Sequence, residues 1–273
     1  MMILDRVTSP GGRHSNEDRL GNSGNFAWVI DGATDLSHDS FLPAETDVQW
    51  LVDRLGEHLT EIGTSSTSAD ARSLLASLSS RLGEEIREEK FPQDRIHPTC
   101  SIGLLISGPQ NLQLARVGDP TCLAFGAETV ELSTDFFGRR EAQAVNRSKS
   151  GDLSQEENRR GIVERRQQYI EGKWEESVFS GHPKARLHIE SATVEATRYQ
   201  YVLLCSDGFA RAVVDYGIYP DWPTLLRTSL EHGLSRVVDQ IRSHEKDRPR
   251  GGKEEEQGHF KKSDDATALL VKI

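Results

Sequence analysis

The sequence is poor in cysteine, and its few cysteines are not arranged for a disulfide framework. Cys100, Cys122 and Cys205 each lie in an apolar stretch, and no Cys-x-x-Cys pair occurs. This pattern predicts buried, reduced thiols. The spacing of His97 and Cys100 is compatible with zinc, but no second pair completes four ligands, so we exclude a zinc site.

Long apolar runs and a net positive charge are also missing. No segment approaches the roughly 18 consecutive apolar residues that a membrane span needs. The N-terminal stretch MMILDRVTSP has an acid where a signal peptide would have basic residues. The formal net charge of −10 argues against a nucleic acid held by a general positive field. We therefore expect a cytoplasmic protein with neither a membrane nor a nucleic-acid partner.

The motifs of several enzyme classes are absent as well. There is no Gly-rich phosphate loop, no GxSxG nucleophile motif and no convincing Ser-His-Asp set. What is present is an ordinary globular composition, in which 36% of the 273 residues are hydrophobic and 28% are charged. This length and composition suit a single domain over residues 1–273 with a sizeable core.

Hydrophobic periodicity predicts alternating sets of strands and helix pairs. Apolar runs predict strands at residues 26–30, 100–107, 112–117, 121–125, 201–205 and 267–273. Stripes with helical spacing predict helices at residues 44–62, 70–86, 223–231 and 234–244. The segment 100–132 is predicted to be an antiparallel meander, because turn residues separate its runs. Helix pairs between sets of strands favour an α+β sandwich over alternating βαβ units.

Two polar stretches interrupt this pattern. Residues 136–182 form a long polar insert with a predicted helix at 154–170. Residues 244–263, HEKDRPRGGKEEEQGHFKKS, mix charge with proline and glycine and are predicted to be a charged, flexible loop.

Acidic residues recur where the apolar strands end. Two buried-type strands stop at Asp-Gly, FAWVIDG at residues 31–32 and YVLLCSDG at residues 207–208. A single Asp-Gly pair is common in turns and by itself indicates no more than a turn. Here, however, further acids flank other strands: Glu17, Asp18, Asp119, Asp264 and Asp265.

These acids predict a site for divalent metal ions. Strand ends can meet at one edge of a sandwich, and carboxylates gathered there repel and acquire raised pKa values unless cations lie among them. All the donors are hard oxygens, which favours Mg²⁺ or Mn²⁺ over zinc or copper. The glycine that follows the aspartate in each Asp-Gly pair lets the backbone carbonyl approach the same ion.

Taken together, the motifs resemble a known family. The sequences NEDR, VIDG, RVGD, LLCSDG and SDDAT occur in the order found in metal-dependent protein phosphatases, the type 2C serine/threonine phosphatases of the PPM family, and are similar to bacterial members. They span Arg13 to Thr267, nearly the whole chain. The resemblance implies an α+β fold, a four-layer α-β-β-α sandwich with two central antiparallel β-sheets flanked by helix pairs. It implies a flap at 136–182, although a tolerated surface insertion stays an open alternative.

The resemblance assigns a ligand set for two Mn²⁺ or Mg²⁺ ions. Asp31 would bridge the two ions, and the carbonyl of Gly32 would contact one of them. Glu17 would lie close by, acting directly or through water. Asp207 and Asp264 would hold the other ion.

Other positions receive supporting roles from the resemblance. Asp18 would orient metal-bound water, and Asp119 matches an acid that helps to hold a third, weaker ion in some members. Asp265 stands where the family often has Asn, which leaves its role as a ligand open. Arg13 would bind the substrate phosphate, because a guanidinium grips two phosphate oxygens at once. Ala33 replaces the histidine that follows Asp-Gly in many eukaryotic members, so the general acid is unassigned.

The function expected from these residues is hydrolysis of phosphoserine and phosphothreonine in proteins. Two metal ions would activate a water that attacks phosphorus in line, without a covalent enzyme intermediate. Two alternatives stay open: a catalytically degenerate phosphatase fold that binds partners, and another dinuclear Mg²⁺ or Mn²⁺ phosphohydrolase such as a nuclease or nucleotidase. Retention of Asp31, Asp207 and Asp264 argues against the first, and the acidic surface argues against a nuclease.

Overall fold

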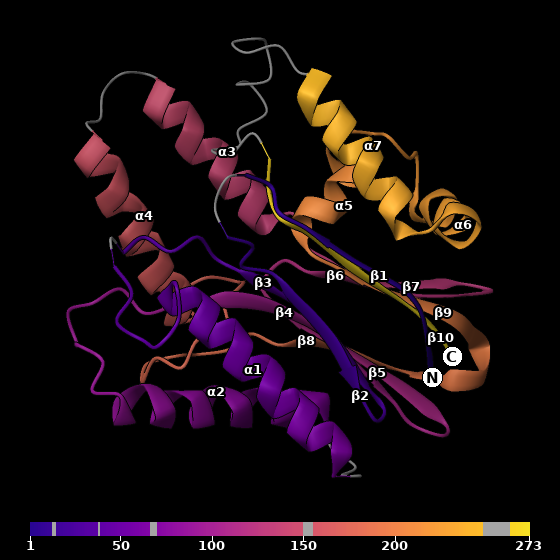
Figure 1. The fold of residues 1–273 in the computed structure, drawn as a ribbon, viewed down its shortest axis with the longest axis horizontal. Helices are drawn as coiled ribbons and strands as arrows, with labels where there is room; N and C mark the ends of the chain where they lie inside the picture. The colour runs from indigo at the N-terminus through magenta and orange to yellow at the C-terminus, as the bar shows by residue number, and fades with distance from the viewer. Residues whose placement is uncertain (13–14, 38, 66–69, 150–154, 248–262) are drawn as a thin grey trace.

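Two antiparallel sheets pack face to face, and helices cover both outer faces (Figure 1). The computed structural model describes residues 1–12, 15–37, 39–65, 70–149, 155–247 and 263–273. The helix–sheet–sheet–helix arrangement confirms the predicted α+β, four-layer fold. No helix among the described residues is both long enough and apolar enough to cross a membrane.

The first sheet carries two long helices on its outer face. Its strands, in spatial order, are β2 (Arg19–Ser23), β3 (Phe26–Gly32), β4 (Cys100–Ser107), β5 (Asn111–Val117) and β8 (Glu190–Glu195). The helices α1 (Asp47–Thr64) and α2 (Ala71–Glu88) cover it (Figure 1). Both helices begin at side-chain caps: Thr46 accepts a hydrogen bond from the backbone N–H of Gln49, and Asp70 accepts one from that of Ser73.

The second sheet contains strands from both ends of the chain and from its middle part. Its strands, in spatial order, are β1 (Met2–Ser9), β10 (Ala266–Lys272), β9 (Tyr199–Cys205), β6 (Thr121–Gly126) and β7 (Thr129–Leu132). Three helices lie on its outer side: α5 (Asp207–Val214), α6 (Trp222–His232) and α7 (Leu234–Asp247) (Figure 1). A short 3₁₀ turn, Ala196–Arg198, joins β8 to β9.

The polar insert contains two helices that stand at one end of the sandwich. These are α3 (Phe136–Lys149) and α4 (Gln155–Ile170) (Figure 1). The helix predicted at 154–170 is confirmed, whereas α3 is a helix that the sequence analysis did not predict. Side chains of α4 reach the segment that follows β3, because Arg159 donates to the carbonyl of Leu36 and Arg166 donates to that of Thr34, both at 2.9 Å.

Three apolar layers explain why the strands are almost continuously hydrophobic. On β3, Phe26, Trp28 and Ile30 pack toward α1 and α2, whereas Ala27 and Val29 pack toward the other sheet. A third cluster lies between the second sheet and α5–α7. Because successive side chains alternate between the faces of a strand, each central strand is buried on both sides. The next residue on the inter-sheet face of β3 after Val29 is an acid.

The sequence-based description of residues 100–132 as one meander is wrong. The strands β4 and β5 pair in the first sheet, but β6 and β7 pair in the second. The chain crosses between the sheets at residues 118–120, where Gly118 has φ +83° and lies so close to Ser101 that a Cβ would be 2.0 Å from its Oγ. An apolar run that is buried on both faces carries no information about which sheet it joins, so the crossing was not predictable.

Several other elements also differ from the sequence-based prediction. The strands β1, β2, β7 and β8 were not predicted, because their burial alternates or is only partial and no apolar run marks them. The helix α5 was missed because its first turn coincides with an Asp-Gly that was interpreted as a strand end. Residues 244–247, predicted as the start of the charged loop, belong to α7, and residues 248–262 lie outside the described part of the chain.

We expect Gly208→Ala to destabilise the protein. A Cβ at residue 208 would lie 2.0 Å from the carbonyl oxygen of Asp265. Overpacking of this kind costs about 1–3 kcal/mol, which outweighs the roughly 0.5–1 kcal/mol that alanine gains over glycine in a helix. The measurement is the free energy of unfolding in urea. Gly138→Ala in α3 is the matched control, since nothing lies within 4 Å of its Cβ position and it should cost no stability. Equal stability of the two variants would contradict the close approach at Gly208.

Candidate metal centre

The acids at the strand ends gather at one end of the layer between the two sheets. Asp31 is the next residue after Val29 on the inter-sheet face of β3. Asp119 lies where the chain crosses from β5 to β6, and Asp207 is the first residue of α5, directly after β9. Asp264 comes just before β10. Five distant segments, counting the one before β2, therefore meet at one place.

The electrostatic influence of these acids on one another confirms how close they lie. The pKa of Asp31 is raised well above its ordinary value, first by burial and then by the charges of Asp18, Asp207, Asp119 and Asp264. The pKa of Asp119 is also raised by burial, although a hydrogen bond with a serine opposes the shift. Carboxylates that crowd together in a partly desolvated place bind protons or cations more tightly than isolated ones do.

Asp207 titrates near neutral pH. Burial and then the charge of Asp264 raise the pKa of Asp207 to about 7, while Arg211 and a hydrogen bond to Asp31 oppose the shift. The residue also begins α5, where the partial positive charge of a helix N-terminus favours a carboxylate. The structure therefore brings Asp207 and Asp31 within hydrogen-bonding reach of each other.

Asp18 is the most deeply buried acid of the group. It is 3% exposed, and its Oδ2 atom has no hydrogen-bond partner. Burial raises its pKa well above the ordinary value, and hydroxyl groups of Thr267 and Ser206 oppose that shift. Sequence reasoning missed these two hydroxyl residues, although both stand at strand ends beside an acid. A buried carboxylate oxygen without a partner is a position where a cation or a bound water is needed.

Asp265 holds the neighbouring segment in place through both of its side-chain oxygens. Its Oδ1 accepts the backbone N–H of Gly11 at 2.8 Å, and its Oδ2 accepts that of Glu17 at 2.9 Å. The side chain of Glu17 accepts a hydrogen bond from Thr46 at 3.0 Å. The backbone of Glu17 lies so close to Gly32 that a Cβ there would be 2.5 Å from the Glu17 carbonyl oxygen. Glycine after Asp31 therefore lets two backbones meet.

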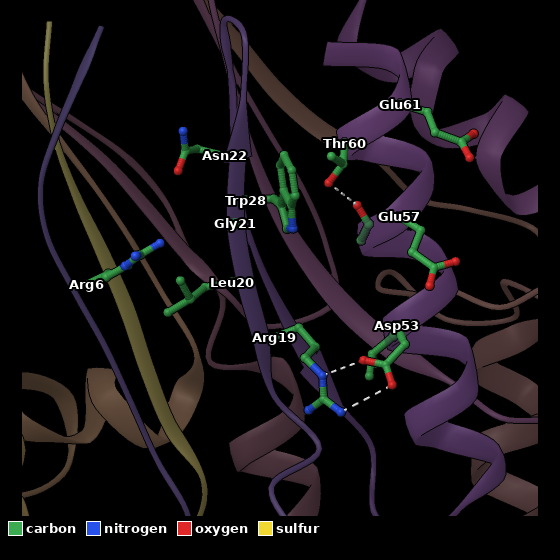
Figure 2. Close-up of a pocket in the computed structure, with 12 residues that line it drawn as sticks. Arg6, Arg19, Leu20, Gly21, Asn22, Trp28, Asp53, Glu57, Thr60 and Glu61 are labelled. Carbon is green, nitrogen blue, oxygen red and sulfur yellow. Dashed lines mark hydrogen bonds and ion pairs between the residues drawn. The ribbon is translucent and has the colours of Figure 1, made fainter. Parts of the chain in front are cut away.

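Arg19 ties the Asp18 segment to α1. Its Nη1 donates to the carbonyls of Asn16 and Asp18 at 2.8 and 2.9 Å, and its Nε donates to Asp53 at 2.6 Å. Figure 2 shows this guanidinium beside a cavity of about 560 Å³ between β2 and α1. None of the clustered acids lines that cavity. It is therefore a separate hollow, and Arg19, which lines it, also contacts the backbone of Asp18.

Arg211 is a charged residue of this site that sequence reasoning also missed. Its side chain is 2% exposed and donates a hydrogen bond to Asp264 at 3.0 Å. It also lies 3.6 Å from Asp207. The sequence did contain a signal for it: Arg211 follows Asp207 by four residues, which places both side chains on one face of a helix.

The donor set fits hard divalent cations, although its side chains are not arranged around one. Across the described ranges, no three His, Cys, Asp or Glu side chains are grouped so as to hold a metal ion. Asp264 is instead paired with Arg211, and both oxygens of Asp265 accept backbone hydrogen bonds. The oxygen chemistry, the raised pKa values and the unpartnered Oδ2 of Asp18 nevertheless suit Mg²⁺ or Mn²⁺. Arg13 lies outside the described residues.

Comparison with known proteins defines the class of fold. No family model and no curated protein matches the sequence. The structure is similar to those of bacterial serine/threonine phosphatases along the whole chain. In total, 117 chains of solved structures show significant similarity. The four-layer fold implied by the motif resemblance is thereby confirmed.

Individual solved structures give the degree of similarity. The serine/threonine phosphatase Stp1 from Staphylococcus aureus aligns with a TM-score of 0.62 and 15% identity, over 100% of this chain and 96% of that one. The phosphatase PstP/Ppp of Mycobacterium tuberculosis aligns with a TM-score of 0.60 and 13% identity, over 100% and 99% of the two chains. The catalytic domain of PstP in complex with two manganese ions aligns with a TM-score of 0.55 and 16% identity, over 99% and 98%.

The metal-free protein is expected to be less stable at pH 8 than at pH 6. An ordinary aspartate titrates near pH 4, whereas Asp207 does so at about 7 in the folded protein. The folded state therefore binds more protons between these values, and its stability is lost as the pH rises through 7. The measurement is the melting temperature in a chelator. Saturating Mn²⁺ should remove the loss, and a melting temperature in chelator that is higher at pH 8 would contradict the crowding of these acids.

Proposed function

We propose that this protein is a metal-dependent serine/threonine protein phosphatase. The observation that carries the proposal is the meeting of Asp31 with four other aspartates from distant segments, in a fold shared over its whole length with bacterial serine/threonine phosphatases. A fold by itself does not define an activity, so the argument rests on the chemistry of this site.

The ligand assignment follows the positions of the acids. We propose that Asp31 bridges two Mn²⁺ or Mg²⁺ ions, with the carbonyl of Gly32 and the side chain of Glu17 contributing to one ion. Asp207 and Asp264 would hold the other. The charge of Asp264 raises the pKa values of Asp31 and Asp207, which supports this grouping, because the same closeness that disfavours several negative charges favours a divalent cation among them.

The remaining acids take supporting roles in the proposal. Asp119 would help to hold a third, weaker ion, and it interacts electrostatically with Asp264. Asp18 would orient water, which agrees with its unpartnered, buried Oδ2. The bound ions would supply an activated water and neutralise charge on the phosphate.

The polar insert, residues 136–182, is proposed to act as a flap beside the site within a single domain of residues 1–273. Two side chains of α4 support this over a remote surface insertion. Arg159 and Arg166 both donate to backbone carbonyls of the segment that follows Asp31-Gly32. Burial lowers the pKa of Arg166 to about 10, while the charges of Asp35 and Glu17 oppose that shift. The insert therefore contacts the segment that carries the central aspartate.

The substrates would be proteins phosphorylated on serine or threonine. The deciding experiment is phosphate release from a phosphothreonine peptide, a nucleotide and single-stranded DNA, each with Mn²⁺ and with a chelator. Metal-dependent release from the peptide alone supports the proposal, and preference for the nucleotide or DNA would favour another dinuclear phosphohydrolase. The cytoplasmic location and the lack of a nucleic-acid partner stay predictions from the sequence.

A second candidate is a catalytically degenerate binding module. The observation that favours it is the ion pair between Arg211 and Asp264, which engages a proposed metal ligand with a protein cation. The same assay separates the two candidates, because a degenerate module releases no phosphate from any substrate in Mn²⁺.

Asp207→Asn is expected to abolish Mn²⁺-dependent hydrolysis of a phosphothreonine peptide, by at least about 100-fold in kcat/KM, because a ligand that anchors an ion contributes several kcal/mol to catalysis. Circular dichroism should show an intact fold. Asp239→Asn, an exposed aspartate of α7, is the matched control and should keep full activity. Unchanged turnover in Asp207→Asn would remove this residue from the site.

Arg13→Ala is expected to raise KM for the phosphopeptide roughly tenfold while leaving Mn²⁺ affinity unchanged, because it removes a charge-assisted contact to phosphate. Arg13→Lys keeps the charge but loses the paired hydrogen bonds, so its KM should lie between those of the wild type and Arg13→Ala. Steady-state kinetics and calorimetry with Mn²⁺ provide the two measurements. An equal loss of metal affinity would show that Arg13 acts on the metal site and not on the phosphate.

A further inference from the structure

Arg211 is a buried cation in direct contact with two carboxylates that we propose as metal ligands. Its Nη2 atom lies 3.0 Å from Oδ2 of Asp264 and 3.6 Å from Oδ2 of Asp207. Its Nε lies 3.9 Å from Asp215, at the end of the same helix. Arginine does not lose its proton in proteins. Among the described residues, the acidic cluster therefore contains a permanent positive charge, the Arg211 guanidinium, that belongs to the chain itself.

The local structure holds this guanidinium among the acids. Arg211 follows Asp207 by four residues in α5, so the two side chains share one helix face. The same helix meets the start of β10 through Gly208, which allows the backbone of residues 264–265 to come close. Asp207 and Asp264 thereby both lie beside the Nη2 atom of one guanidinium.

Arg211 and the neighbouring carboxylates shift one another's pKa values. Burial lowers the pKa of Arg211, but Asp207 and Asp264 raise it, and the net pKa lies above its ordinary value. Conversely, Arg211 opposes the rise of the Asp207 pKa that burial and Asp264 cause. The guanidinium thus already performs part of the neutralisation that a divalent cation would perform. Its Nη1 is buried without a hydrogen-bond partner, so that nitrogen adds no further anchor.

We propose that Arg211 is a built-in cation of the acidic centre, which neutralises Asp207 and Asp264 in the metal-free protein and competes with a divalent ion for them. The inference rests on the proposed metal centre. It explains why no three acids are grouped around a point in the described residues, because Asp264 is turned toward Arg211. Metal uptake by Asp264 would then require this ion pair to open, which makes Arg211 a positioning residue that sets metal affinity.

The test compares wild type, Arg211→Gln and Arg211→Lys in Mn²⁺ affinity and thermal stability. Affinity is measured by competition with a chelator, starting from Mn²⁺-loaded protein, so that a variant unstable without metal still gives a value. Arg211→Gln should bind Mn²⁺ roughly tenfold more tightly, since a charge-assisted hydrogen bond to Asp264 no longer has to break. Arg211→Lys keeps the charge with weaker pairing and should lie between the two.

Thermal stability provides the second measurement. In chelator, Arg211→Gln should melt well below the wild type, because it leaves crowded carboxylates without a cation, and saturating Mn²⁺ should close most of that gap. Arg95→Gln is the matched control. Arg95 pairs with the buried Asp47 at 2.7 Å, away from the acidic cluster. This control should lose the same stability with and without Mn²⁺ and should keep wild-type Mn²⁺ affinity.

The outcomes separate this inference from the proposed function. If the wild type binds Mn²⁺ and Arg211→Gln binds it equally or more weakly, competition by Arg211 is wrong while the metal centre stands. If only Arg211→Gln binds Mn²⁺, the inference holds and the metal-dependent function of the wild type is wrong. If no variant binds Mn²⁺, the metal centre is wrong and the inference with it.

Discussion

The repulsion between carboxylates crowded at one end of the inter-sheet layer is the constraint on which the site depends. Asp31 lies within electrostatic reach of four other aspartates, each carried by a different segment. Such a group stays together only if protons, a cation or strong backbone anchoring offset the repulsion. All three are present or implied: raised pKa values, the guanidinium of Arg211, and the clamp by which Asp265 holds Gly11 and Glu17.

Close backbone packing around the acids is the second requirement. The Asp-Gly pairs recur because a side chain at residue 32 would collide with Glu17, and one at residue 208 would collide with Asp265. The sequence analysis attributed these glycines to a carbonyl that approaches a metal ion. The structure adds a different reason, which is the meeting of two backbones. Both reasons are compatible at residue 32, where the carbonyl stays a proposed ligand.

The shared fold defines the architecture of this protein, whereas its individual contacts bear on the properties of the site. Alignment over essentially the whole chain with serine/threonine phosphatases, at identities of 13–16% for the three compared, establishes the architecture. Several contacts of this chain depend on single residues: Arg211 lies among the acids, and Arg159 and Arg166 link the insert to the segment after Asp31. These contacts bear on how tightly metal is held and on how the insert is placed, properties that a common fold leaves open.

The sequence by itself determined the buried strands, the main helix pairs and the set of acids, because alternating burial and the Asp-Gly breaks are local patterns. The tertiary structure alone decided which sheet β6 joins, since both faces of that strand are apolar. It also decided that Arg211 faces Asp264, because residues 53 positions apart meet only through the pairing of β9 with β10. Likewise, Asp265 accepts hydrogen bonds from the backbone N–H groups of Gly11 and Glu17, which depends on where those two residues lie relative to β10. Local patterns encode which residues are buried or charged, whereas their partners depend on how distant strands pair.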